Sequence, residues 1–218
     1  MRILTISDQI ELSLYHPSIR ARLGRIDLVL SCGDLPFYYI DFVCSLLGAP
    51  CYYVFGNHAQ GLEHSLYPPA PPSAGVNLDG RLVCERGLLI AGLEGARRYN
   101  NNPRFQYTDN EMWLKVISLI PQLLRARARY GRFLDILITH APPLGIHDGP
   151  DRAHQGFSSF LAFMRWFRPR YLIHGHKHVY GRGEVTETRY HDTIVINTFG
   201  FRLIEIEQGA CERALHVR

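Results

Sequence analysis

Three histidines alternate with other residues at the end of a short apolar segment, Tyr171–His178. Neutral imidazole is the side chain that most often binds metals in proteins. Because side chains two residues apart point to the same side of an extended chain, His174, His176 and His178 could all face one way. A short histidine tract alone is a weak metal signal, and one of the three could simply be packed. The tract becomes a candidate site only if other ligand-type residues join it.

Four earlier segments follow the same plan, since each is an apolar, strand-like run that ends in Asp, Asn or His. They are Ile3–Asp8, Leu28–Asp34, Tyr52–His58 and Leu134–His140. In open α/β sheets, ligands bind beyond the carboxyl ends of the strands. Five such strand ends therefore predict one site at the edge of a sheet.

Asp, Asn and His together supply oxygen and nitrogen ligands. This mixture suits Mn²⁺, Fe or Zn²⁺ better than Ca²⁺ or Mg²⁺, which favour oxygen. One Asp can bridge two ions about 3.5–4 Å apart, and such a pair activates a hydroxide and clamps a phosphoryl oxygen. A nearby histidine that is not a ligand could protonate the leaving oxygen. Phosphate ester hydrolysis is the reaction that this set of residues fits best.

The order of these residues resembles that of the calcineurin-like metallophosphoesterase superfamily, over nearly the whole chain. The matching blocks are Asp8, Gly33-Asp34, Gly56-Asn57-His58, His140 and Gly175-His176-Lys177-His178. The resemblance implies an α/β fold, a four-layer α/β/β/α sandwich of two mixed sheets flanked by helices. It also implies two divalent metal ions, with Asp34 as the bridging ligand. By the same resemblance, Asp8 and His178 would serve the first ion, Asn57, His140 and His176 the second, and His58 would be the catalytic acid or would orient the phosphate.

Two positions depart from the pattern of this superfamily. Ile10 stands where the first segment usually has a histidine, two residues after Asp8, and Ala59 stands where an acid usually follows the Asn-His pair. We therefore expect the first metal site to be weak or empty, and Ala59 to weaken the support of His58 or the metal.

A polar stretch, residues 94–106, holds the candidates for substrate binding: Arg97, Arg98, Tyr99 and Asn100. Guanidinium forks suit phosphate oxygens, and Tyr99 could stack on a base. An ordinary surface loop is an equally good interpretation. His174 lies outside the ligand pattern, so packing or a hydrogen bond is the better interpretation of it.

The remaining elements support this fold. Apolar strands at residues 2–7, 26–32 and 51–55 alternate with helical segments at 12–23 and 38–47, which predicts parallel pairing. Pro17 marks the start of the first helical segment or a break in it. A capping box, Thr108-Asp-Asn-Glu111, opens a helix that Pro121 should kink or divide. Strands at 185–190, 193–197 and 201–206 resemble an antiparallel meander that completes the second sheet.

The chain has 218 residues, of which 46% are hydrophobic and 20% charged, as expected for one globular domain over residues 1–218. The net charge of +4 without a long basic run does not indicate a membrane surface or a dedicated nucleic-acid surface. Five cysteines without a C-x-x-C pair argue against a disulfide framework, and Cys32, Cys44, Cys51 and Cys84 are predicted core residues. The absence of a signal-peptide pattern or a long apolar segment favours the cytoplasm.

The leading hypothesis is a metal-dependent phosphoesterase that uses metal-activated hydroxide on a phosphomonoester or phosphodiester of a small molecule or nucleotide. A nuclease is one alternative, although the modest charge argues against nucleic acid as the partner. The other alternative, motivated by Ile10 and Ala59, is a non-catalytic metal or nucleotide sensor with a degenerate first metal site.

Overall fold

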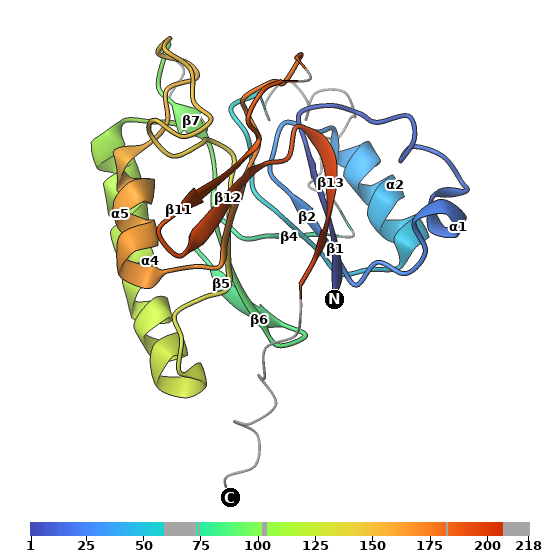
Figure 1. The fold of residues 1–218 in the computed structure, drawn as a ribbon, viewed down its shortest axis with the longest axis horizontal. Coiled ribbons are helices and arrows are strands. Elements are labelled where there is room, and N and C mark those ends of the chain that lie inside the picture. The colour runs from blue at the N-terminus through green and yellow to red at the C-terminus, as the bar shows by residue number, and fades with distance from the viewer. Residues whose placement is uncertain (59–72, 74, 102–103, 182, 207–218) are drawn as a thin grey trace, which may run out of the picture.

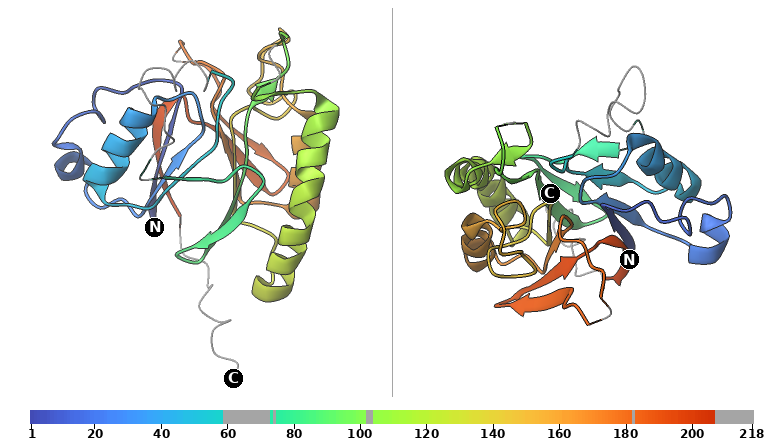
Figure 2. Two further views of the ribbon diagram at one scale, coloured as in Figure 1. Left: turned by 180° about the vertical axis from the view of Figure 1, so that it is seen from behind. Right: turned by 90° about the horizontal axis from the view of Figure 1, so that it is seen from above.

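The computed structural model describes residues 1–58, 73, 75–101, 104–181 and 183–206. Two mixed β-sheets lie face to face, and helices cover the outer side of each (Figures 1 and 2). This α/β arrangement confirms the predicted fold class. Ala59 and Cys211 lie outside the described residues.

The first sheet has the strand order β13-β1-β2-β3-β4. Its strands are β1 (Arg2–Ser7), β2 (Leu28–Ser31), β3 (Cys51–Tyr53), β4 (Gly75–Asn77) and β13 (Gly200–Glu205). Strands β1 to β4 pair in parallel, as the alternation of strands and helices predicts. Helices α1 (Ile19–Leu23) and α2 (Phe37–Leu47) cover its outer face (Figure 1).

The second sheet has the strand order β11-β12-β10-β9-β6-β5. Its strands are β5 (Leu82–Glu85), β6 (Leu88–Leu93), β9 (Ile136–Thr139), β10 (Tyr171–His174), β11 (Glu187–Tyr190) and β12 (Thr193–Asn197). Helices α4 (Asp109–Tyr130) and α5 (Ser158–Phe167) lie against its outer face (Figure 1). Two short strands, β7 (Ala96–Arg97) and β8 (Gln106–Tyr107), pair in parallel within the polar stretch before α4.

Alternation along the strands divides the core into three apolar layers. Residues between the two sheets include Ile3, Leu28, Leu30, Ile136, Ile138 and Ile173. Their neighbours along the strands face outward instead, toward α1 and α2 (Leu4, Ile6, Val29) or toward α4 and α5 (Leu89, Leu137, Leu172). Strands buried on both faces hold the loops at their carboxyl ends on a rigid base.

The C-terminal strands do not form the predicted meander. Strand β11 does pair antiparallel with β12, but β13 crosses to the first sheet and pairs antiparallel with β1. The pairing runs from Arg2 opposite Glu205 to Ser7 opposite Gly200. Ile204 and Ile206 thereby enter the layer between the sheets. The residue pattern of β13 is compatible with pairing in either sheet, so the sequence alone did not show which sheet this strand joins.

Helix α4 begins with the predicted capping box, in which Glu111 N donates to Thr108 Oγ1 and Thr108 N donates to Glu111 Oε2. The prediction that Pro121 divides this helix is wrong, because α4 runs unbroken from Asp109 to Tyr130. Pro121 is exposed, so the carbonyl group that lacks its usual N–H partner lies on the solvent side.

Within the segment 12–23 the helix begins at Ile19, after Pro17, as expected if Pro17 marks its start or a break. One smaller prediction needs correction. Cys84 is exposed on the edge strand β5, whereas Cys32, Cys44 and Cys51 are buried free thiols as predicted. In the described part of the chain, no helix is both long and apolar enough to cross a membrane.

Candidate metal centre

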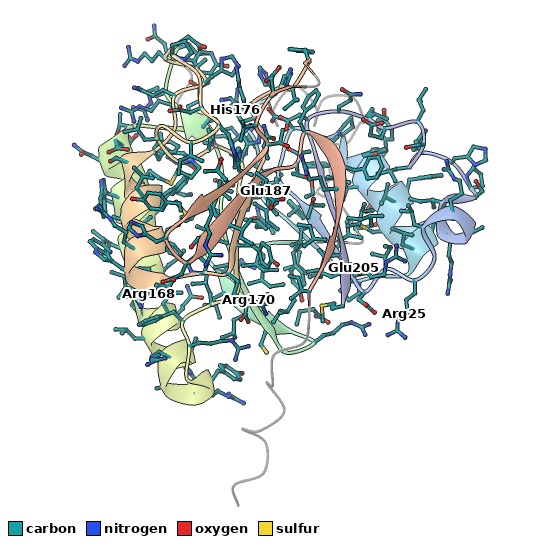
Figure 3. The ribbon with its side chains drawn as sticks, viewed as in Figure 1. Arg25, Arg168, Arg170, His176, Glu187 and Glu205 are labelled. Carbon is teal, nitrogen blue, oxygen red and sulfur yellow. The ribbon has the colours of Figure 1, made fainter. Side chains whose placement is uncertain are left out.

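The ligand-type residues gather at one end of the two sheets, where parallel strands finish. Asp8 directly follows β1, Asp34 follows β2, and His140 directly follows β9. His176, two residues beyond β10, lies at this upper edge in Figure 3. The carboxyl ends of strands from both sheets thus bring together residues that are far apart in sequence.

Three of these side chains form a compact group. Asp34, His140 and His176 each offer one ligand atom, and these atoms lie within 4.8 Å of one another. Asn57 joins them, since its Oδ1 atom lies 3.0 Å from Nε2 of His140. The donor set of one carboxylate, one amide oxygen and two imidazoles is the one predicted for the second metal ion.

Each histidine of the group has one ring nitrogen fixed by a backbone carbonyl. The Nδ1 atom of His140 lies 2.8 Å from the carbonyl oxygen of Cys32, and Nε2 of His176 lies 2.7 Å from that of Ala153. These bonds place a hydrogen on the outer nitrogen of each ring. The other nitrogen is left for a metal, which is how partners beyond the ligands orient metal-binding histidines.

Electrostatics favour a cation at the centre of the group. His140 is fully buried, and burial alone would disfavour its charge, but the carboxylate of Asp34, 3.2 Å away, raises the pKa of His140 to about 9. Burial likewise opposes ionisation of Asp34, yet His140 holds the pKa of Asp34 below its ordinary value. Burial lowers the pKa of His176 to about 3, so this ring is neutral. Two acceptor oxygens beside Nε2 of His140, together with a neutral His176, fit a divalent ion.

The backbone at the centre adopts an uncommon conformation. Asp8, Asp34 and His176 have φ values of 62°, 53° and 66°, in the left-handed region that residues with a side chain rarely occupy. Such conformations persist only where the surrounding structure enforces them, and they cluster at functional sites.

Glycine precedes the ligands for a steric reason. A Cβ atom on Gly33 would lie 2.7 Å from Nδ1 of His140, and one on Gly56 would lie 2.7 Å from Cε1 of the same ring. A Cβ atom on Gly175 would overlap the side chains of Ser7 and Asp8. The blocks Gly-Asp, Gly-Asn-His and Gly-His thus allow loops from different strands to pack against one another.

The residues predicted for the first ion are arranged less favourably. Oδ2 of Asp8 accepts hydrogen bonds from Ser7 Oγ at 2.5 Å and from the backbone N–H of His176 at 2.9 Å. Burial and, to a lesser extent, Asp34 raise the pKa of Asp8. Ile10 is half-buried and packs against the core layer next to α1 and α2.

His178 is exposed and contacts two aromatic side chains. Its ring lies over Phe199, with centroids 4.8 Å apart, and its Nδ1 atom lies 2.8 Å from the Tyr180 hydroxyl. Among the described residues, the compact ligand group contains neither Asp8 nor His178.

His58, the predicted acid, lies at the rim of the centre. Its backbone N–H donates to Oδ1 of Asp34 at 2.9 Å, and its charge contributes to the lowered pKa of that carboxyl. The side chain is exposed. It can therefore reach a molecule that approaches Asp34 from solvent.

The four predicted substrate residues have different surroundings. Arg97 reaches Asp109 and the carbonyl of Gly156, each at 3.4 Å, and Arg98 reaches Glu111 at 3.0 Å.

Both guanidinium groups therefore brace the start of α4. The hydroxyl of Tyr99 instead lies 3.3 Å from Nδ2 of Asn57, while Asn100 is exposed. Tyr99 thus contacts a residue of the candidate centre directly.

His174 is packed and hydrogen-bonded, which confirms the interpretation from sequence. Its Nε2 atom lies 3.1 Å from Nδ1 of His147, whose Nε2 atom lies 2.9 Å from the Thr188 hydroxyl. Burial lowers the pKa of His174 to about 3 and that of His147 to about 4, so both rings are neutral.

Sequence reasoning missed Ala153, whose carbonyl orients His176. The loop that carries it also holds His154, whose ring centroid lies 5.2 Å from that of His176 and whose Nδ1 atom contacts Asp151 at 2.9 Å. A ligand orientation that depends on a backbone carbonyl leaves no mark on residue type, so the sequence carried no signal for Ala153.

A group of candidate metal ligands at the edge of two mixed sheets is the feature by which the chain can be classified, and the comparisons agree with this fold. Residues 1–180 match the family model described as calcineurin-like phosphoesterase, and the chain belongs to this family. No curated protein sequence matches the chain.

Solved structures share the fold at low identity. TT1561 of Thermus thermophilus aligns with a TM-score of 0.56 and 16% identity, over 91% of this chain and 89% of that one. GAP50, described as the anchor in the inner membrane complex of Plasmodium, aligns with a TM-score of 0.51 and 14% identity, over 90% of this chain and 70% of that one.

Proposed function

We propose that the chain is a metal-dependent phosphoesterase that hydrolyses a phosphomonoester or phosphodiester of a small molecule or nucleotide. The observation that supports this best is the convergence of Asp34, His140 and His176, with Asn57 beside them, at one sheet edge. These four residues would hold a divalent ion, for which Mn²⁺, Fe and Zn²⁺ are the suitable choices. Such an ion supplies a nucleophile at neutral pH and polarises a phosphoryl oxygen.

Side chains around the ion would supply the proton and position the substrate. His58 is exposed next to Asp34, where it can donate a proton to the leaving oxygen of the ester. Tyr99 fixes the amide of Asn57 so that the oxygen of that amide faces His140. Arg97 and Arg98 hold the stretch that carries Tyr99 and Asn100, and these two side chains would border the substrate.

A first ion would need Asp8, Asp34 and His178. For His178 to join them, its ring must leave Phe199 and Tyr180, and Ile10 offers no ligand atom in its place. We therefore propose that this site binds its ion more weakly than the site formed by Asn57, His140 and His176.

The test is metal content together with turnover. The purified protein is dialysed against Mn²⁺, and hydrolysis of bis-p-nitrophenyl phosphate and p-nitrophenyl phosphate is followed. We expect Asp34→Asn to lose both metal and activity, and His58→Ala to keep its metal while kcat falls about 10²–10⁴-fold. His16→Ala, which changes an exposed histidine in the turn before α1, should behave as wild type. Absence of turnover of either ester at every Mn²⁺ concentration would overturn the proposal.

A non-catalytic metal or nucleotide sensor is the second candidate. Ile10 packed against the core and His178 on Phe199 favour it, because both weaken the two-ion arrangement. GAP50, which shares this fold, is described as the anchor in the inner membrane complex of Plasmodium. Tight nucleotide binding without hydrolysis at saturating Mn²⁺ would favour the sensor.

A further inference from the structure

A cavity of about 510 Å³ lies beside the segment that follows β1. Its other walls come from the segment after His178, the residue before β11, the end of β12 and the beginning of β13. Gln9, Glu11, Val179, Phe199, Phe201 and Arg202 contribute most of its wall. Ligand pockets in proteins commonly have volumes of about 300–1,000 Å³, so a group as large as a heterocyclic base fits this space.

The cavity is lined by the chain neighbours of Asp8 and His178, and Asp8 in turn accepts a hydrogen bond from the backbone N–H of His176. Gln9 follows Asp8 in the chain, and Val179 follows His178. The ring of Phe199, in the cavity wall, packs against the ring of His178. A phosphoester held at the centre could therefore place its organic group in this cavity.

Ile10, which stands where the superfamily usually has a histidine, lies between two residues of one cavity wall. Ile10 packs against the core, whereas Gln9 and Glu11 on either side of it line the cavity. Gln9 Nε2 donates to Glu11 Oε1 at 3.1 Å. The Glu11 carboxylate accepts hydrogen bonds only, and its two oxygens have room for more than this one.

Arg202 supplies a fixed positive charge. Its Nε atom donates to the carbonyl of Asn197 at 3.1 Å, and its Nη2 atom donates to the Thr186 hydroxyl. Glu11 and Arg202 together make the wall neutral in net charge, while the two phenylalanines provide flat apolar surface. A neutral, planar group that also forms hydrogen bonds matches this wall, and a nucleobase has these properties.

We propose that this cavity binds the base of a nucleotide ester, with Glu11 accepting a hydrogen bond from an exocyclic amino group. A carboxylate of this kind pairs with the amino group of cytosine and has no donor for the corresponding oxygen of uracil. The proposal rests on the proposed function only in that the phosphate is expected at the metal centre.

The test is binding by isothermal titration calorimetry to the full chain with Mn²⁺ present. The probes are cytidine 5′-monophosphate, uridine 5′-monophosphate and ribose 5-phosphate, which lacks a base. We expect the cytidine nucleotide to bind roughly tenfold tighter than the uridine nucleotide, the effect of one hydrogen bond to a charged group. Ribose 5-phosphate should bind more weakly than both nucleotides.

Glu11→Gln should abolish or reverse the preference for cytosine, because an amide can donate to the oxygen of uracil. Glu187→Gln, which changes an exposed carboxylate on β11, is the matched control and should leave the preference unchanged. Equal affinities for all three probes, or an unchanged preference in Glu11→Gln, would overturn the proposal.

Failure of the two ideas can be told apart. Hydrolysis of bis-p-nitrophenyl phosphate together with equal affinities for the three probes would reject the base-binding cavity alone. Base-selective binding that depends on Glu11, without hydrolysis of any ester, would reject the phosphoesterase and keep the cavity.

Discussion

The amide nitrogen of Asn57 lies 3.3 Å from the hydroxyl of Tyr99, while the amide oxygen of the same residue lies 3.0 Å from Nε2 of His140. An amide can present either its oxygen or its nitrogen, and only the oxygen can bind a metal. A tyrosine hydroxyl can accept as well as donate, and here it accepts from Nδ2, which leaves the oxygen of Asn57 facing His140.

Tyr99→Phe should weaken Mn²⁺ binding by about tenfold, the lower end of the usual effect of removing a partner that orients a ligand. Titration calorimetry with Mn²⁺ measures this directly. Tyr52→Phe is the matched control, because it removes a tyrosine hydroxyl that bonds to Glu85 at 2.9 Å, outside the centre. An unchanged affinity in Tyr99→Phe would show that Asn57 is oriented by something else.

Binding of Mn²⁺ should raise the free energy of unfolding. We expect this gain to depend on His140 and its neighbours and to depend little on His178. At a free concentration of 100 Kd, an ion that binds only the native state adds about 2.7 kcal/mol to the free energy of unfolding. We expect His140→Ala to lose this gain and His178→Ala to retain most of it, because the ring of His178 lies over Phe199. Thermal unfolding with and without Mn²⁺ measures both. Equal losses in the two variants would place His178 among the ligands of the stabilising ion.

The convergence of Asp34, His140 and His176 was predictable because its causes are local to each strand. An apolar strand ending in Asp, Asn or His fixes where that residue emerges, and parallel pairing brings the ends together. The glycines of the motifs carry the same information, since Gly33 and Gly56 allow the close approach to His140.

What could not be predicted depends on partners distant in sequence. The ring of His178 packs against Phe199, which lies in the connection from β12 in the second sheet to β13 in the first. Arg97 and Arg98 were predicted to suit phosphate. In the structure their guanidinium groups form ion pairs with Asp109 and Glu111 at the start of α4. The residue types alone gave no means of choosing between these partners.

Gly175→Ala should destabilise the protein strongly. The added Cβ would lie 2.8 Å from Cβ of Ser7 and would also overlap Asp8, so the loop after β10 would have to move off the end of β1. Overpacking of this kind typically costs about 1–3 kcal/mol, which corresponds to a fall in Tm of roughly 2–12 °C for a chain of this size. Gly183→Ala is the control, because a Cβ there meets no other atom within 4 Å. Equal melting temperatures for the two variants would contradict the predicted packing.

Glu94 should make stability depend on pH. It is 8% exposed, and burial together with the nearby Asp79 raises the pKa of Glu94 to about 7, although Lys115 lies 3.7 Å away. Since the ordinary pKa is 4.5, the native state holds this proton more tightly than the unfolded state. The contribution of the protonated carboxyl is therefore present below about pH 4.5 and is lost as the pH rises through about 7.

Glu94→Gln cannot titrate, so its free energy of unfolding relative to wild type should rise between pH 5 and pH 8, by on the order of 1–3 kcal/mol. Urea unfolding at the two pH values measures this difference. The matched control is Glu187→Gln on β11, where the carboxylate is exposed and the difference from wild type should stay nearly constant. The buried position of Glu94 beside Asp79 predicts the rise, because the amide removes a charge that the site disfavours above pH 7. If the difference between Glu94→Gln and wild type also stays constant with pH, then Lys115 and the Tyr107 hydroxyl fully compensate for burial of the charge. That hydroxyl lies 2.7 Å from Oε1 of Glu94.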